Sequence, residues 1–170
     1  MDRVTSYHDD IYAWSQEQAS ALRRLAAIRR DLPNELDLEH VAEEIEDLGK
    51  SEIRTVESFI ELLLQHLVKL ASVPGAPPAR HWRDEIVIQQ RGARDDFKPS
   101  MAQSIRLERI WDAARRRADA ALDQYGETVL PSLPAVCPFS LNDLLAEPFD
   151  IDAAADRLRQ NALISGGSAP

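Results

Sequence analysis

The residues best suited to chemistry lie in one segment, ELDLEHVAEEIEDLGKSE at positions 35–52. At about 100° per residue, a helix there gathers four polar side chains into one continuous stripe beside an apolar stripe. The four are His40, Glu43, Glu44 and Asp47. An imidazole nitrogen and carboxylate oxygens form a ligand set that suits zinc, manganese or iron. The pattern therefore makes His40, Glu44 and Asp47 candidate ligands of a divalent metal.

The rest of the sequence does not complete such a site in a known pattern. Dinuclear carboxylate bundles use Glu-x-x-His pairs on two helices. The chain has no Glu-x-x-His and no His-Glu-x-x-His. EEIED at 43–47 comes close to the EExxE helix of the all-α nucleoside-triphosphate pyrophosphohydrolases, but the partner ExxD on a following helix is missing. We therefore expect no cofactor, and keep a divalent-metal-dependent, nucleotide-directed hydrolase as the alternative function.

Charge is segregated along the chain. Ten acids and two bases lie between Glu35 and Glu61, within a net charge of -9. A later segment supplies an arginine counter-face made of Arg106, Arg109, Arg115 and Arg116. The first helix also ends with Arg23, Arg24, Arg29 and Arg30. Our hypothesis is that the acidic stripe docks against an arginine-bearing helix, within the chain or across a homodimer, which favours a protein-interaction module.

The elements that must position these residues are helices. Glycine is scarce, with 6 in the chain, and prolines cluster between long apolar-periodic segments. We predict an all-α bundle of about four main helices, with a proline-rich break at 73–78 and short C-terminal helices. Gly49 leaves two options open, a continuous helix or a helix end followed by a new start. The predicted helices cover about 9–30, 38–70, 80–97 and 100–125, with short ones after 140 and at 152–163.

Helical spacing also predicts which side chains form the core. Tryptophans at helical spacing usually pack rather than bind a ligand, so all three are expected inside the bundle. They are Trp14, Trp82 and Trp111. The expected apolar stripes of the first two helices are Ile11, Trp14, Leu22, Leu25 and Ile28, and then Leu38, Val41, Ile45 and Leu48. Asp37 is the predicted N-cap of the second helix, and Ser140 with Asp143 forms a predicted capping pair.

Composition bounds the domain organisation and the location. We expect one helical domain at 1–150 and a C-terminal helical extension with a mobile tail at 151–170. The one cysteine, Cys137, and the lack of a signal-peptide pattern predict a cytoplasmic protein. No apolar run is long enough to span a membrane. The negative net charge argues against nucleic-acid binding.

Several segments occur in an order and spacing that resemble a known bacterial family. They are DDIYAWSQEQ, LDLEHVAEEIEDLGKSE, LLLQHLVKL, WRDEIVIQQR and CPFSLNDLL. Over about residues 7–149 the chain resembles the domain-of-unknown-function family number 29, and the acidic segment is the most specific part. The resemblance implies an all-helical fold and a bacterial origin, and assigns no activity. The chain departs from the family where it reads KLASVPGAPP, since such proteins often read KWQYQP there.

Overall fold

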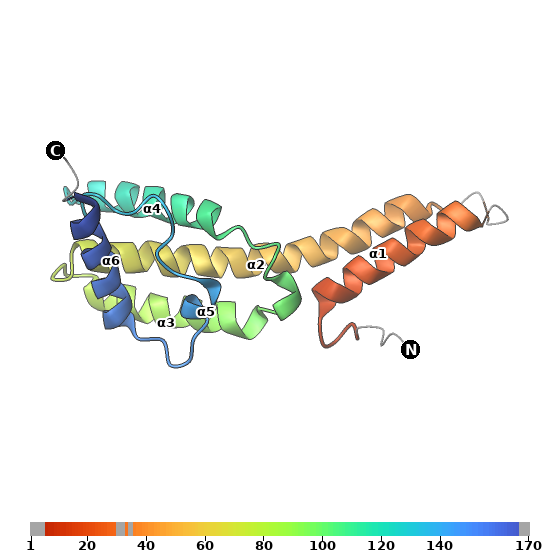
Figure 1. Ribbon diagram of the computed structural model, residues 1–170, viewed down its shortest axis with the longest axis horizontal. Coiled ribbons are helices and arrows are strands. Elements are labelled where there is room, and N and C mark those ends of the chain that lie inside the picture. Colours follow the sequence, from red (N-terminus) through yellow and green to blue (C-terminus); the bar gives the residue numbers. More distant parts are fainter. Residues whose placement is uncertain (1–5, 30–32, 34–35, 167–170) are drawn as a thin grey trace. The chain divides into compact units, whose positions relative to one another are not determined.

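The computed structural model describes residues 6–29, 33 and 36–166, and every regular element within these ranges is helical. The helices are α1 Ile11–Ile28, α2 Leu38–Ser72, α3 Ala79–Asp96, the short 3-10 helix η1 Pro99–Met101, α4 Leu107–Asp123, α5 Leu141–Leu144 and α6 Ile151–Gly166 (Figure 1). The predicted all-α fold, with a proline-rich break at 73–78 and short C-terminal helices, is confirmed. Arg30, Glu35 and the end of the predicted mobile tail, at 167–170, lie outside the described residues.

The chain forms two compact units. Unit 1 comprises residues 1–55 and 96–105, and unit 2 comprises residues 56–95 and 106–170. Helix α2 contributes its first part to unit 1 and the remainder to unit 2. No helix within the described ranges has both the length and the apolar character that crossing a bilayer requires.

Helix α2 is continuous across Gly49, which settles the choice that the sequence left open. It begins after Asp37, whose carboxylate accepts a hydrogen bond of 3.1 Å from the backbone N–H of His40, as the predicted N-cap requires. Gly49 is buried against α1. A Cβ at this position would overlap Ser15 Oγ and would lie 3.2 Å from Tyr12 Cδ2. The glycine is therefore needed for close helix packing and not for a helix end.

Unit 1 is built on an antiparallel pair of helices, α1 and the first part of α2, and we call this pair the hairpin (Figure 1). On α1 the buried residues are the small residues Ser15 and Ala19. In α2 the buried residues of this part are Leu38, Ala42, Gly49 and Ile53.

The predicted apolar stripes of the hairpin are therefore wrong in part. Leu25 and Ile28 on α1 are exposed, and so are Val41 and Leu48 on α2. The close approach at Gly49 leaves no room for a larger side chain there, so Leu25, Val41 and Leu48 lie to the side of the contact.

The predicted start of the fourth helix is also wrong. Helix α4 begins at Leu107, and η1 followed by a turn occupies the preceding residues. Met101 and Ile105 are buried, as the apolar spacing implied. These two residues are four apart, as on one face of a helix, although the backbone between η1 and α4 is not helical. Gly126, shortly after the end of α4, has a φ of 71°, a left-handed conformation that glycine adopts without strain.

Unit 2 contains the larger apolar core. Helices α3 and α4 lie on either side of α2, and α6 covers one end of them (Figure 1). Trp82 and Trp111 are buried in this core, as predicted. Trp14, in unit 1, is instead half-buried and meets the Tyr7 ring edge-on at a centroid distance of 4.9 Å. Fully buried residues of α2 in this unit include Val56, Ile60, Leu63, Leu64, Leu67 and Leu70.

Buried polar contacts hold the connecting segments of unit 2. The Gln90 amide on α3 donates hydrogen bonds to the carbonyl oxygens of Leu144, at 3.3 Å, and Ala146, at 2.9 Å. Ser140 caps α5, and its side chain and that of Asp143 exchange hydrogen bonds with each other's backbone N–H, so the predicted capping pair is confirmed.

Candidate functional site

The polar stripe predicted on α2 forms an exposed face of unit 1. His40, Glu43, Glu44 and Asp47 are all exposed. We call these four residues the acidic face. They share it because α2 is helical and continuous over this segment, and because the opposite side of the helix packs on α1. The stripe therefore exists as predicted, and its chemistry depends on the partners of each side chain.

His40 is bound by the residue that caps its own helix. Its Nδ1 lies 2.5 Å from Asp37 Oδ2, while the other oxygen of that carboxylate caps the helix. This hydrogen bond and the charges of Asp37 and Glu43 raise the pKa of His40 above its usual 6.5. Conversely, the hydrogen bonds from His40 lower the pKa of Asp37. Protonated His40 is thus favoured next to two carboxylates.

The other acids of this helix are divided between two sides. Lys50 Nζ lies 2.8 Å from Asp47 Oδ1, which lowers the pKa of Asp47. Arg23 of α1 binds Glu39 and Glu46, each at 3.0 Å. These two glutamates lie beside the hairpin contact, outside the acidic face. Among the described residues, Glu43 and Glu44 have no hydrogen bond or ion pair, so their charges face solvent.

The metal ligands suggested by the sequence are not joined by further ones. Within the described ranges, no group of three or more His, Cys, Asp and Glu side chains is placed so that it could hold a metal ion. A bound cation would need to displace Asp37 from His40 Nδ1, or use Nε2, and to displace Lys50 from Asp47. The ligand role of His40, Glu44 and Asp47 stays a prediction.

His66 belongs to unit 2 and has a structural role. Its Nδ1 lies 2.8 Å from the carbonyl oxygen of Leu62, and burial and the charge of Lys69 lower its pKa. His66 is therefore a half-buried histidine that is hydrogen-bonded within its own helix. Lys69 is itself buried, and its Nζ lies 5.1 Å from the centroid of the Trp82 ring.

The predicted arginine counter-face on α4, in unit 2, separates into two groups. Arg115 is occupied within the unit, since it donates to the carbonyl oxygen of Pro134 at 3.2 Å and pairs with Asp112 at 2.6 Å. Arg106, Arg109 and Arg116 are exposed. No hydrogen bond or ion pair with a described residue involves the side chain of any of these three.

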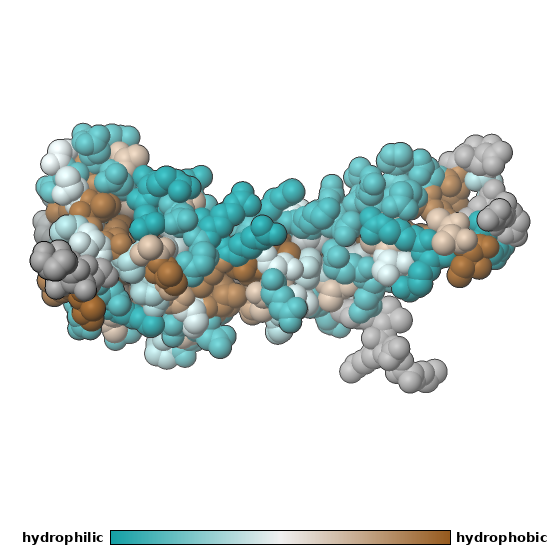
Figure 2. All heavy atoms as spheres, turned by 45° about the horizontal axis from the view of Figure 1, so that its top comes forward, coloured by the Kyte–Doolittle hydropathy of each residue, from teal (hydrophilic) through white to brown (hydrophobic). Residues whose placement is uncertain are grey.

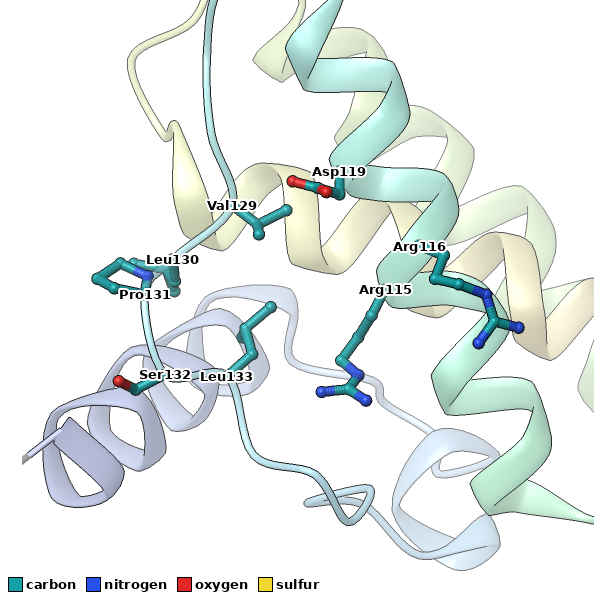
Figure 3. A pocket seen from close by; sticks show the side chains of 8 residues that line it. All are labelled: Arg115, Arg116, Asp119, Val129, Leu130, Pro131, Ser132 and Leu133. Carbon is teal, nitrogen blue, oxygen red and sulfur yellow. The ribbon is translucent and has the colours of Figure 1, made fainter. Parts of the chain in front are cut away.

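An open groove of about 400 Å³ runs between α4 and the segment 129–133. Figure 3 shows Arg115 reaching between the helix and this segment, whereas Arg116 points to another side of α4. Asp119 lies on the same groove and offsets part of the arginine charge. Exposed positive charge without an ion pair to a described residue is therefore carried by Arg109 and Arg116 on α4 and by Arg106 at its N-cap, whereas exposed Arg117 pairs with Glu61.

Two features of the site were missed by sequence reasoning. One is the pairing of Asp37 with His40, although the Asp-x-x-His spacing places a capping carboxylate within reach of a side chain one turn later. The other is the burial of Lys69 beside Trp82 in unit 2, which the leucines around Lys69 did not predict. Cys137 is buried, and this burial raises the pKa of its thiol to about 11, which lowers its reactivity.

The described part of the chain is thus all-helical, with an exposed acidic helix face on α2 and no cluster of three or more potential metal ligands. The family profile "Domain of unknown function DUF29" matches residues 6–150, and the chain belongs to this family. A solved structure with a TM-score of 0.83 and 38% identity covers 92% of this chain and 99% of its own. It is an alpha-helical protein of unknown function from Rhodospirillum rubrum. No curated protein matches.

Proposed function

We propose that this protein is a cytoplasmic interaction module whose acidic face on α2 binds a basic surface of a protein partner. The observation that carries the proposal is the exposure of Glu43 and Glu44 without a hydrogen bond or ion pair in the described chain. The nearby Arg23 is bound to Glu39 and Glu46 instead. The charges of the acidic face therefore remain available to a partner.

A helix presents such a face rigidly. The cap at Asp37 and the contact at Gly49 fix the start and the middle of this part of α2, so little conformational freedom is lost when a partner binds. Opposite charges across an interface increase the association rate and exclude wrong partners, and the effect weakens with salt. The exposed arginines of α4 give the chain a second, basic surface of the same kind.

The test compares two variants with the same change in net charge. Glu43→Lys with Asp47→Lys reverses the acidic face, and Asp84→Lys with Glu127→Lys is the matched control at exposed positions in unit 2. Tagged proteins are crosslinked in extracts of the native host, and bound proteins are quantified by mass spectrometry. Glu44 is left unchanged because it lies at the edge of the face nearest Val41 and Leu48.

We expect Glu43→Lys with Asp47→Lys to reduce the recovery of a partner at least about tenfold, whereas wild type and the control variant retain that partner. Raising the salt concentration should also reduce the recovery of this partner by wild type. Circular dichroism must show unchanged helix content for both variants. Equal recovery by the two pairs, or binding that is insensitive to salt, would contradict the proposal.

A further inference from the structure

The hairpin of unit 1 exposes four large apolar side chains, which we call the apolar flank. Leu25 and Ile28 on α1 are 39% and 76% exposed, and Val41 and Leu48 on α2 are 41% and 38% exposed. Figure 2 shows hydrophobic surface gathered near the end of the hairpin, beside a hydrophilic surface. The close contact at Gly49 leaves these four side chains outside the helix contact in the described part of unit 1.

The α2 members of the flank lie on a defined side of that helix. The buried residues Leu38, Ala42 and Gly49 of α2 set the direction toward α1. Counting about 100° per residue from this direction, Glu39 and Glu46 fall about 60–80° to one side. Val41 and Leu48 fall about 80–100° to the other side. The acidic and apolar edges of the helix contact are thus opposite each other.

Leu25 of α1 lies on the same side of the hairpin as Val41 and Leu48, whereas Ile28, about 160° from the buried direction, lies near the outer face of α1. Counting from its buried residues, Arg23 falls about 60° to one side of α1 and Leu25 about 100° to the other, with Ile28 further outward. Arg23 binds both Glu39 and Glu46, so the charged edges of the two helices coincide. Their apolar edges must therefore coincide too. The hairpin has one charged side and one apolar side.

The charges that border the apolar flank select its partner. Exposed Arg24 lies at the outer edge of α1, and exposed Glu44 lies at the outer edge of α2. The segment 38–55 of α2 has six acids against two bases, whereas α1 has two arginines against one glutamate. A second copy of the hairpin offers the same apolar surface, together with a glutamate that can pair with Arg24 and an arginine that can pair with Glu44.

Two symmetric arrangements bring one apolar flank onto another. A twofold axis parallel to the helices places α1 of each copy on α2 of the other, which brings Arg24 toward Glu44 of the second copy. A twofold axis across the helices places α2 on α2, and acidic helices then face each other. Opposite charges favour the first arrangement, and like charges oppose the second.

We infer that the protein forms a homodimer in which two hairpins associate through their apolar flanks into a four-helix bundle, with α1 of each copy packed on α2 of the other. Such a bundle removes Leu25, Val41 and Leu48 of each copy from water, and Ile28 lies at its edge. It leaves His40, Glu43 and Asp47 on the outside, since these point away from α1 or toward the charged side. The inference shares only Glu44 with the acidic face, and it leaves the charges of Glu43 and Asp47 free for another partner.

The first test measures mass by sedimentation equilibrium. Wild type should have twice the mass of the chain at micromolar concentration. Leu25→Glu and Val41→Glu should each weaken the dimer at least about tenfold, because each places a charge in an apolar contact. Val87→Glu is the matched control, since Val87 is 56% exposed in unit 2, and it should leave the dimer unchanged. A monomeric wild type, or a dimer that Leu25→Glu and Val41→Glu leave intact, would overturn the inference.

The second test reads helix order without disturbing the flank. In a Cys137→Ser background, Arg24→Cys and Glu44→Cys proteins with different tags are mixed and treated with a short bismaleimide. A crosslink between the two tags should form in the mixture, at least about fivefold more than either protein forms alone. Equal crosslinking of Arg24→Cys with itself would show α1 facing α1 and would overturn the proposed order. Arg24→Glu combined with Glu44→Arg should restore the dimer that each single reversal weakens.

Discussion

The substitution Gly49→Ala probes the contact that sets the geometry of unit 1. In an exposed helix interior, replacing glycine by alanine stabilises by about 1 kcal/mol, because alanine has the higher helix propensity. Gly49 is buried, and an added Cβ would overlap Ser15 Oγ and lie 3.2 Å from both Ser15 Cβ and Tyr12 Cδ2. Helix propensity and overpacking change the free energy of unfolding in opposite directions. The sign of the measured change therefore shows whether α1 and α2 are closely packed at Gly49.

The magnitude follows from these contacts. Overpacking of this kind costs about 1–3 kcal/mol. Rotating the Ser15 side chain does not avoid the cost, because its hydroxyl would give up the 2.8 Å hydrogen bond to the carbonyl oxygen of Tyr12, and its Cβ would remain in place. After the propensity gain is subtracted, Gly49→Ala should destabilise by about 1 kcal/mol. Adding Ser15→Ala should recover most of this loss.

The assay is urea unfolding followed by circular dichroism, with hydrogen exchange of the peptides covering α1 and residues 38–55 to assign the effect to unit 1. Ser51→Ala is the control, because Ser51 is exposed on the same helix, and it should change stability by less than about 0.5 kcal/mol. Stabilisation by Gly49→Ala of the size expected at an exposed site would refute close packing of α1 on α2. Additive effects of Gly49→Ala and Ser15→Ala would refute the role of Ser15.

Three further predictions concern single side chains. NMR titration of His40 should give a pKa above 6.5, and Asp37→Asn should lower it. Because the pKa of His40 is raised in the folded state, its pair with Asp37 stabilises the start of α2 fully below about pH 6.5. This contribution is lost as the pH rises through the folded pKa of His40. An unchanged pKa of His40 in Asp37→Asn would contradict the pairing. The Cys137 thiol, with its pKa raised from 9.0 to about 11, should react with iodoacetamide at pH 8 about 100-fold more slowly than in urea-unfolded protein, and equal rates would show that it is not buried. Gln90→Ala should destabilise by about 1–3 kcal/mol, because two carbonyl oxygens lose their donor, whereas Gln160→Ala at an exposed position should have little effect; similar urea midpoints for the two would contradict this role.

The helices could be predicted because their apolar residues recur with helical spacing over long segments. Spacing does not say which of two adjacent stripes faces a neighbouring helix. In the hairpin, Ser15 and Gly49 have larger apolar neighbours in the sequence. The small residues form the contact because they allow the helices to approach closely. The start of α4 was misplaced for a related reason, since Met101 and Ile105 are buried from a backbone that is not helical.

The acidic face was predictable for the same reason as the helix, because four polar residues must share a side when α2 is continuous. Their partners were not predictable. The choice of Arg23 as the partner of Glu39 and Glu46 depends on how far α1 is shifted along α2, which the contact between Ser15 and Gly49 fixes. Sequence alone offered several arginines and no means of choosing among them.

The central claim, that the acidic face binds a protein partner, is tested most directly by photo-crosslinking in the native host. A photoreactive amino acid replaces His40, and the same amino acid at exposed Arg91 in unit 2 serves as the control. We expect a discrete crosslinked species from position 40 that is absent from position 91 and lost when Glu43 and Asp47 are changed to lysine. A species that persists in the lysine variant, or the lack of any species specific to position 40, would contradict it.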